Sequence, residues 1–250
     1  MGRGRGRGPR RASRKLQNCR PLVINLGILF NWRCSKIQEK GKSMRAAASR
    51  PSIVLLGGST RPDSTTEKAL HHAARIIEEL GGRTEVFSGT EIDLPMFAPE
   101  NPERTPMARR IIKALRACDG IVIASPGYHG AMSGLMKNLL DYVEDLSKDS
   151  SPYFHGRAVG LIAAAATPRD LGTVLMSLRS VVHALRGWPT PMGVAINAKV
   201  PAFDAEGRCK PELAGQLRLL AEQVMEFAGK RALLERAFAP IQDADFLAWA

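Results

Sequence analysis

The chain has 250 residues and carries 36 Lys and Arg against 24 Asp and Glu, a formal net charge of +12. Residues 1–50 hold 14 of the basic residues and one acid, whereas residues 51–250 hold 22 basic and 23 acidic residues. The charge therefore belongs to an N-terminal segment, and the near-neutral remainder excludes a uniformly basic, nucleic-acid-binding core.

A chain of this length suits one domain of about 180 residues with extensions. We predict a basic N-terminal extension over residues 1–50, a core domain over 51–230 and a C-terminal extension over 231–250. The first extension opens with the low-complexity run Gly2–Arg11, whose composition cannot bury a core. Three origins stay open for it: an extended reading frame upstream of a native start at Met44, a flexible basic tail, or a targeting segment.

An apolar run in this extension, Leu22–Trp32, has about half the length that a membrane span requires. The four cysteines form no C-x-x-C pair and show no metal-ligand spacing. Free thiols in a reducing compartment are the simplest explanation, so we predict a cytoplasmic protein. The adjacent His71 and His72 would point to different faces of a helix, and we predict no metal site.

The core begins with a buried strand that leads into a polar loop. Ile53–Leu56 is a short apolar run typical of parallel sheets, and Gly57 and Gly58 close it. Ser64 and Glu67 have capping-box spacing, so a helix is expected to start there. Its free N–H groups and dipole would favour a phosphate. The candidate phosphate ligands are Ser59, Arg61, Ser64, Thr65 and Thr66.

This loop differs from two well-known phosphate loops. No Lys follows its glycines, as a Walker loop requires, and the adjacent glycine pair lacks the G-x-G-x-x-G spacing. Hydroxyls and one Arg suit the terminal oxygens of a monophosphate, such as that of FMN, better than a bridging pyrophosphate. The alternative is an ordinary strand–turn–helix with a polar loop and no ligand.

A second unit of the same kind lies further along the chain. Ile121–Ala124 reads as a buried strand, and a helix is expected from about Ser133 or Gly134. Open α/β sheets bind ligands where the loops at the carboxyl ends of neighbouring strands meet. The candidate ligand-contacting residues of this second loop are Pro126, Gly127, Tyr128, His129 and Gly130.

Strands and helices alternate through the core. We predict strands near 52–58, 83–88, 120–125, 157–165 and 191–197. We predict helices near 65–80, 104–117, 134–147, 171–186 and 211–230. Five such units without long hairpins indicate an α/β fold in which helices cover both faces of a parallel sheet.

Through its two loops the chain resembles the NADPH-dependent FMN reductase family of flavodoxin-like quinone, azo-dye and chromate reductases. The first loop of that family has the form G-S-x-R-x-x-S, which residues 58–64 match. The second is close to P-E-Y-N-x-S-x-P-G-x-L-K-N, which residues 126–138 match in part. The resemblance covers roughly residues 51–230 and implies a flavodoxin-like, five-stranded parallel sheet in the order 2-1-3-4-5.

The second loop departs from the family pattern at several positions. The departures are Gly127 for Glu, His129 for Asn, Ala131 for Ser, Ser133 for Pro and, further on, Tyr142 for Trp. The resemblance implies flavin contacts mainly through backbone N–H groups and Tyr128, which these changes leave in place. The missing Glu bears on subunit contacts and substrate preference. Asn138 is expected to tie the loop back, and His129 either lines the site or only fills the Asn position.

The resemblance implies an oxidoreductase that binds FMN and uses NADPH or NADH as hydride donor. The implied acceptors are a quinone, an azo compound, a metal oxyanion or free flavin. Because the cofactor carries the chemistry, we predict no catalytic side chain. A homodimer or homotetramer is implied, since a neighbouring subunit would complete a half-open flavin site. The alternative is an electron-transfer or redox-sensing module with a nucleic-acid-contacting arm, and the near-neutral core argues against it because flavodoxins are strongly acidic.

Overall fold

The computed structural model describes residues 50–204 and 207–238, without the side chains of residues 232–238. Residues 1–49, 205–206 and 239–250 lie outside the description. The predictions made for the basic N-terminal extension and for the last part of the C-terminal extension therefore fall outside it as well.

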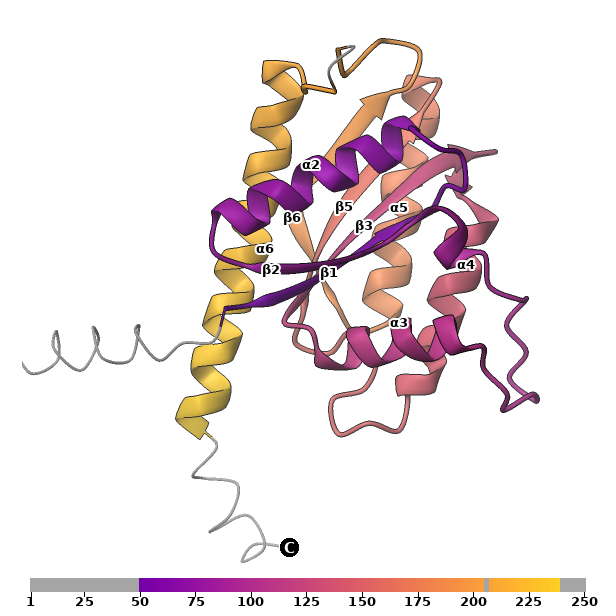
Figure 1. Cartoon of the computed structure of the whole chain (residues 1–250), viewed down its shortest axis with the longest axis vertical. Coiled ribbons are helices and arrows are strands. Elements are labelled where there is room, and N and C mark those ends of the chain that lie inside the picture. The colour runs from indigo at the N-terminus through magenta and orange to yellow at the C-terminus, as the bar shows by residue number, and fades with distance from the viewer. Residues whose placement is uncertain (1–49, 205–206, 239–250) are drawn as a thin grey trace, which may run out of the picture. The chain divides into compact units, whose positions relative to one another are not determined.

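Five parallel strands form the centre of the core (Figure 1). They are β1 (Ser52–Gly57), β2 (Arg83–Phe87), β3 (Gly120–Tyr128), β5 (Ala158–Ala165) and β6 (Trp188–Asn197). Their spatial order is β2-β1-β3-β5-β6, which confirms the predicted flavodoxin-like order of five parallel strands. The two-residue strand β4 (Ala131–Met132) pairs antiparallel with the end of β3, and it is not among the strands predicted from the sequence.

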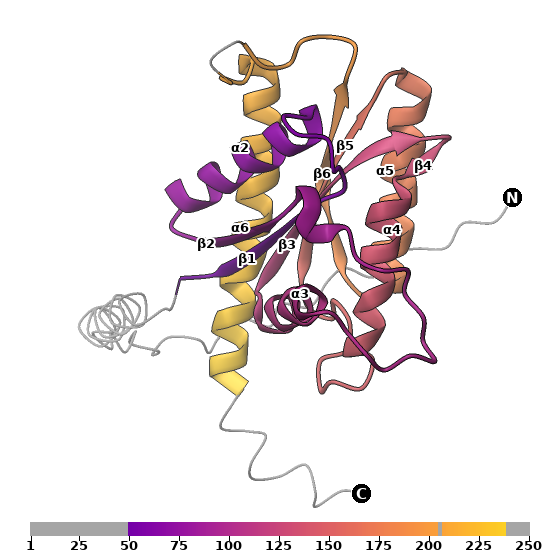
Figure 2. The same cartoon turned by 45° about the vertical axis from the view of Figure 1, so that its right-hand side comes forward.

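Helices cover both faces of the sheet (Figure 2). The helices are α2 (Thr65–Glu79), α3 (Pro106–Ala117), α4 (Gly134–Asp141), α5 (Pro168–Ala184) and α6 (Pro211–Phe238), with the 3-10 turns η1 (Gly89–Ile92) and η2 (Tyr142–Leu146). Successive side chains of a strand point to opposite faces. Ile53 and Leu55 accordingly pack with α2 and α6, whereas Val54 and Leu56 pack with α3, α4 and α5.

The helix boundaries differ from the predicted ones where capping residues decide them. Helix α5 starts at Pro168 and not at residue 171, because the Thr167 side chain caps it and proline fits the first helical position. Helix α6 continues to Phe238, past the predicted end at residue 230. The described residues contain no helix of the length and hydrophobicity that a membrane span needs.

Candidate functional site

The two polar loops leave the sheet side by side at the carboxyl ends of β1 and β3. Gly57 pairs with Ala124 in the parallel register, and the Gly58 N–H donates to the Ala124 carbonyl at 2.7 Å. Pairing thus continues up to the last residue before the first loop. The structure therefore brings the loop after β1 to the start of the loop after β3.

The first loop ends in a capped helix N-terminus. Ser64 is 97% buried in an extended conformation, and its Oγ accepts from the Glu67 N–H at 3.2 Å. This is the side-chain half of the predicted capping box. The N–H groups of Thr65 and Thr66 open the helix, where no preceding turn supplies carbonyl acceptors. The loop therefore presents backbone donors and a positive helix end to an anion.

The side chains of Ser59 and Arg61 differ in burial and in hydrogen bonding. The Ser59 side chain is buried and its Oγ accepts from the Arg61 N–H at 3.2 Å. The Arg61 side chain is exposed, and within the described residues no acceptor pairs with its guanidinium. Among the described residues, the positive charge of Arg61 in this loop is therefore available for a bound anion.

The second loop is a tight hairpin, which corrects the predicted strand end at residue 125. β3 continues to Tyr128 and pairs with β4 (Figure 2), and by the strand bounds His129 and Gly130 form the turn. Both have positive φ angles, +51° and +84°, as a type I′ hairpin turn requires. His and Asn adopt positive φ angles more readily than most residues. The backbone conformation of the turn can therefore account for either residue at position 129.

Gly127 and Tyr128 face different surroundings in the hairpin. A Cβ at Gly127 would lie 2.6 Å from Val174 and 3.0 Å from Ala165, so the close packing of α5 leaves no room for a side chain there. A Glu at residue 127 would therefore require Val174 or the hairpin to shift. Tyr128 is 58% exposed. The hairpin therefore offers a fixed backbone surface with one free aromatic ring.

A third loop joins β5 to α5 at residues 166–167. Residues 163–165 pair with the ends of β3 and β6, and Thr167 caps α5 by accepting from the Asp170 N–H at 3.3 Å. A Cβ at Gly130 would come within 3.9 Å of Thr173 Oγ1 on α5. Helix α5 therefore borders the hairpin.

Asn138 has a different partner from the one expected. Its amide oxygen accepts from the Phe97 N–H at 2.8 Å, and its amide nitrogen donates to the carbonyls of Leu94 and Pro95 at 3.1 and 3.0 Å. The side chain thus holds the loop between η1 and α3, and it does not tie back the second loop. The sequence contains no signal for this pairing, because the partners lie more than forty residues away.

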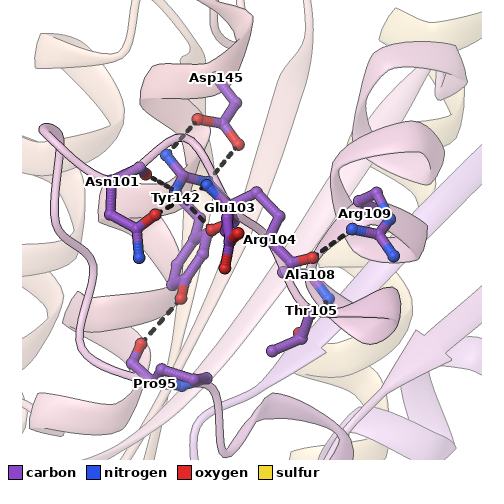
Figure 3. A network of polar contacts seen from close by, with 9 residues as sticks. All are labelled: Pro95, Asn101, Glu103, Arg104, Thr105, Ala108, Arg109, Tyr142 and Asp145. Carbon is purple, nitrogen blue, oxygen red and sulfur yellow. Dashed lines mark hydrogen bonds and ion pairs between the residues drawn. The ribbon is translucent and has the colours of Figure 1, made fainter.

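Arg104 anchors the other end of that loop (Figure 3). Its guanidinium donates to both carboxylate oxygens of Asp145, at 2.8 and 2.9 Å. It also stacks 5.4 Å from the ring centre of Tyr142, whose hydroxyl donates to the Pro95 carbonyl at 2.9 Å. Bidentate pairs of this kind impose geometry as well as attraction. The loop holds Met96 at 80% exposure on this rigid support.

A cavity of about 870 Å³ lies next to the first loop. Thr60, Pro62 and Asp63 line it together with residues of α2, β2 and η1 and with Gly207, and no residue of the hairpin takes part. It therefore adjoins the outer side of the first loop, and the space between the two loops is separate from it.

The described cysteines and histidines belong to no metal-binding cluster. Cys118 is buried in the hydrophobic core, and this burial raises the pKa of its thiol to about 11. Within the described ranges, no three His, Cys, Asp or Glu side chains lie close enough to hold a metal ion.

Comparison with known proteins gives a consistent result. A family model described as NADPH-dependent FMN reductase matches residues 51–201. The chain is 29% identical over 171 residues to the NADPH-dependent FMN reductase ArsH of Rhizobium meliloti, which covers 68% of this chain and 69% of that protein. It is 33% identical over 146 residues to an NADPH azoreductase of a Bacillus species, covering 58% of this chain and 76% of that protein.

Two solved structures show the same fold. The flavoenzyme NAD(P)H:(acceptor) oxidoreductase FerB of Paracoccus denitrificans matches with a TM-score of 0.56 at 19% identity, over 71% of this chain and 98% of that one. RosB, solved with a bound 8-demethyl-8-formylriboflavin-5'-phosphate intermediate, matches with a TM-score of 0.59 at 15% identity, over 78% and 88%. At such identities the likeness concerns the fold.

Proposed function

The chain belongs to the NADPH-dependent FMN reductase family, and from the geometry of its loops we propose where FMN lies and what the protein reduces. The protein is an FMN-dependent NAD(P)H oxidoreductase, as family and relatives agree. The electron-carrier alternative receives no support from them. The acceptor, the subunit arrangement and the residues that hold the flavin are proposals.

We place the FMN phosphate at the N-terminus of α2. The N–H groups of Thr65 and Thr66 stand at the start of the helix, where no preceding helical turn supplies acceptors, and Ser59, Ser64, Thr65 and Thr66 bring four hydroxyls to this part of the chain. The Arg61 guanidinium, which has no acceptor among the described residues, supplies a positive charge for a dianion. Hydroxyls, backbone donors and one guanidinium fit a terminal monophosphate.

We place the flavin ring against the hairpin, beside residues Pro126–Gly130. The observation that carries this proposal is the Gly58–Ala124 hydrogen bond, since it sets the phosphate loop next to the start of the hairpin. When bound, FMN supplies the redox chemistry between NAD(P)H and the acceptor. The chain's own part is to bind the phosphate, to hold the ring in one orientation and to leave one side of it accessible to substrates.

The acceptor is a small oxidant that reaches the accessible side, such as a quinone, an azo compound, a metal oxyanion or free flavin. The exposed ring of Tyr128 indicates that one monomer leaves this side open. A second subunit therefore completes the site in a homodimer or homotetramer. Sedimentation of the active enzyme at assay concentration tests this, and a fully active monomer would rule it out.

The decisive experiment is a spectrum followed by an assay. The purified full-length chain should carry or take up FMN, with a yellow flavin absorbance, and should oxidise NADPH when a quinone or an azo dye is added. NADH serves as the comparison donor. A protein that neither binds FMN nor oxidises either nucleotide would refute the proposed function.

The basic N-terminal segment takes no part in this chemistry in our proposal. The first strand begins at Ser52, and the phosphate loop follows it directly. A chain that starts at Met44 should therefore keep its flavin and its NADPH oxidation rate. We place the protein in the cytoplasm. Loss of flavin on this truncation would show that the segment supports the core.

A further inference from the structure

Two buried serines lie under the point where the flavin loops meet. Ser125, in β3, is fully buried, and Ser133, which precedes α4, is 97% buried. The Ser133 hydroxyl donates to the Gly58 carbonyl at 2.8 Å, and the Ser133 N–H donates to the Ser125 hydroxyl at 3.0 Å. The Ser125 hydroxyl in turn donates to the Pro126 carbonyl at 2.9 Å. One chain of hydrogen bonds thus links the first residue of each loop.

The surroundings of Gly58 leave no room for a side chain. A Cβ on Gly58 would come within 2.9 Å of Ser133 Oγ and of Met136 Cβ, and within 3.2 Å of Ser125 Oγ. The backbone of the first loop therefore starts in direct contact with the N-terminal turn of α4. A shift of Ser133 would move Gly58, and Ser59 follows it in the chain.

Ser133 has a second, ordinary role that must be separated from this one. It is the N-cap of α4, and its Oγ accepts from the Met136 N–H at 3.1 Å. An N-cap side chain needs only to accept a hydrogen bond, so the hydroxyl proton of Ser133 remains available for a second hydrogen bond. Here the Ser133 hydroxyl donates that proton in the hydrogen bond to the Gly58 carbonyl, at the start of the loop after β1. Proline, which the related motif has at this place, supplies neither the hydroxyl nor the N–H.

We propose that Ser133 is a positioning residue for the flavin, which holds the phosphate loop against the second loop through the Gly58 carbonyl. This inference rests on the proposed placement of FMN at these loops. In the free protein the bond keeps the loop in its binding-competent form, and apparent affinity falls in proportion when that fraction falls. A single hydrogen bond corresponds to about a two- to twelvefold change in such an equilibrium.

The test compares variants that separate the cap from the bond between the loops. Ser133→Ala removes both, whereas Ser133→Gly removes the hydroxyl at little cost in capping, because glycine is itself an acceptable N-cap. We expect apo protein of both variants to bind FMN about three- to tenfold more weakly than wild type, measured by quenching of FMN fluorescence. The temperature is chosen so that all variants are folded.

Thr105→Ala is the matched control. Thr105 caps α3 in the same way, accepting from the Ala108 N–H at 3.1 Å, and among the described residues its side chain makes no hydrogen bond to the loop after β1 or to the hairpin. This variant should lower the melting temperature and leave the FMN dissociation constant unchanged. Wild-type affinity in Ser133→Gly, or an equal loss in Thr105→Ala, would overturn the inference. A wild-type chain that binds no FMN would instead refute the proposed function.

Discussion

The loops after β1 and β3 occupy equivalent places in neighbouring strand–loop–helix units, yet they use their polar groups in opposite ways. The first loop is open: Arg61 is unpaired within the described chain, and the first N–H groups of α2 point to no acceptor. The second is closed, because Gly127 and Tyr128 pair with β4 across a two-residue turn. One loop keeps its donors free, and the other uses its backbone to fix its own shape.

The contrast suggests a division of labour between the loops. Recognition of a dianionic phosphate needs free donors, and these exist only where the backbone is not already paired. Support of a flat ring needs a surface that does not move. Removal of the exposed, unpaired Arg61 side chain from the first loop should therefore lower FMN affinity without affecting folding, whereas a change that strains the hairpin turn should affect both.

Arg61→Ala should give the largest effect on binding. A hydrogen bond to a charged group contributes about 1.5–3 kcal/mol, so FMN affinity should fall about ten- to a hundredfold in a fluorescence titration. The melting temperature of the apo protein should not change, because the side chain is exposed and unpaired within the described residues. Arg83→Ala, an exposed arginine at the amino end of β2, should alter neither quantity. Unchanged affinity in Arg61→Ala would remove Arg61 from the phosphate site.

Gly58→Ala probes the one crowded point of the open loop. The new methyl group would lie 2.9 Å from Met136 Cβ, and overpacking of this kind costs about 1–3 kcal/mol. We expect both a lower unfolding free energy in urea and weaker FMN binding. If the variant instead matches wild type in both measurements, the loop is free to move away from α4 and the described contact does not constrain it.

Gly130→Val should disturb the hairpin. Residue 130 has a φ of +84°, where a β-branched residue is strained by about 1–2 kcal/mol. The expected results are a lower melting temperature and a lower flavin content after purification. Gly172→Val is the control, since that glycine lies in α5 with open space around it. A Gly130→Val protein with full flavin content and turnover would show that the ring lies elsewhere.

His129→Asn should give the smallest effect. Asn also tolerates a positive φ, so the turn should persist and FMN affinity should stay within about twofold of wild type if the side chain serves the turn alone. His129→Val, which disfavours this conformation, should destabilise the protein. A marked change of KM for the acceptor in His129→Asn, with an unchanged melting temperature, would instead place the imidazole beside the substrate.

Much of the fold follows from local patterns. Branched apolar runs such as Ile53–Leu56 and Ile121–Ala124 predict buried parallel strands, and the Ser64–Glu67 spacing predicts the start of α2. These predictions succeed because strand burial and helix capping depend on residues a few positions apart. The predicted end of β3 at residue 125 is wrong for the opposite reason. A glycine-rich run was interpreted as a loop, although His129 and Gly130 are suited to a two-residue hairpin turn.

The sequence by itself determined the family and, through that resemblance, the order of the strands, and it predicted a polar loop between the first buried strand and a capped helix. The tertiary structure decided which groups meet across long separations. It joins Ser133 to Gly58 over 75 residues, turns Asn138 toward Leu94 and Phe97, and packs Val174 where a side chain at residue 127 would have to fit. Such contacts leave no periodic or capping pattern in the chain. They arise only when parallel strands place distant loops at one edge of the sheet and close packing then selects the partners.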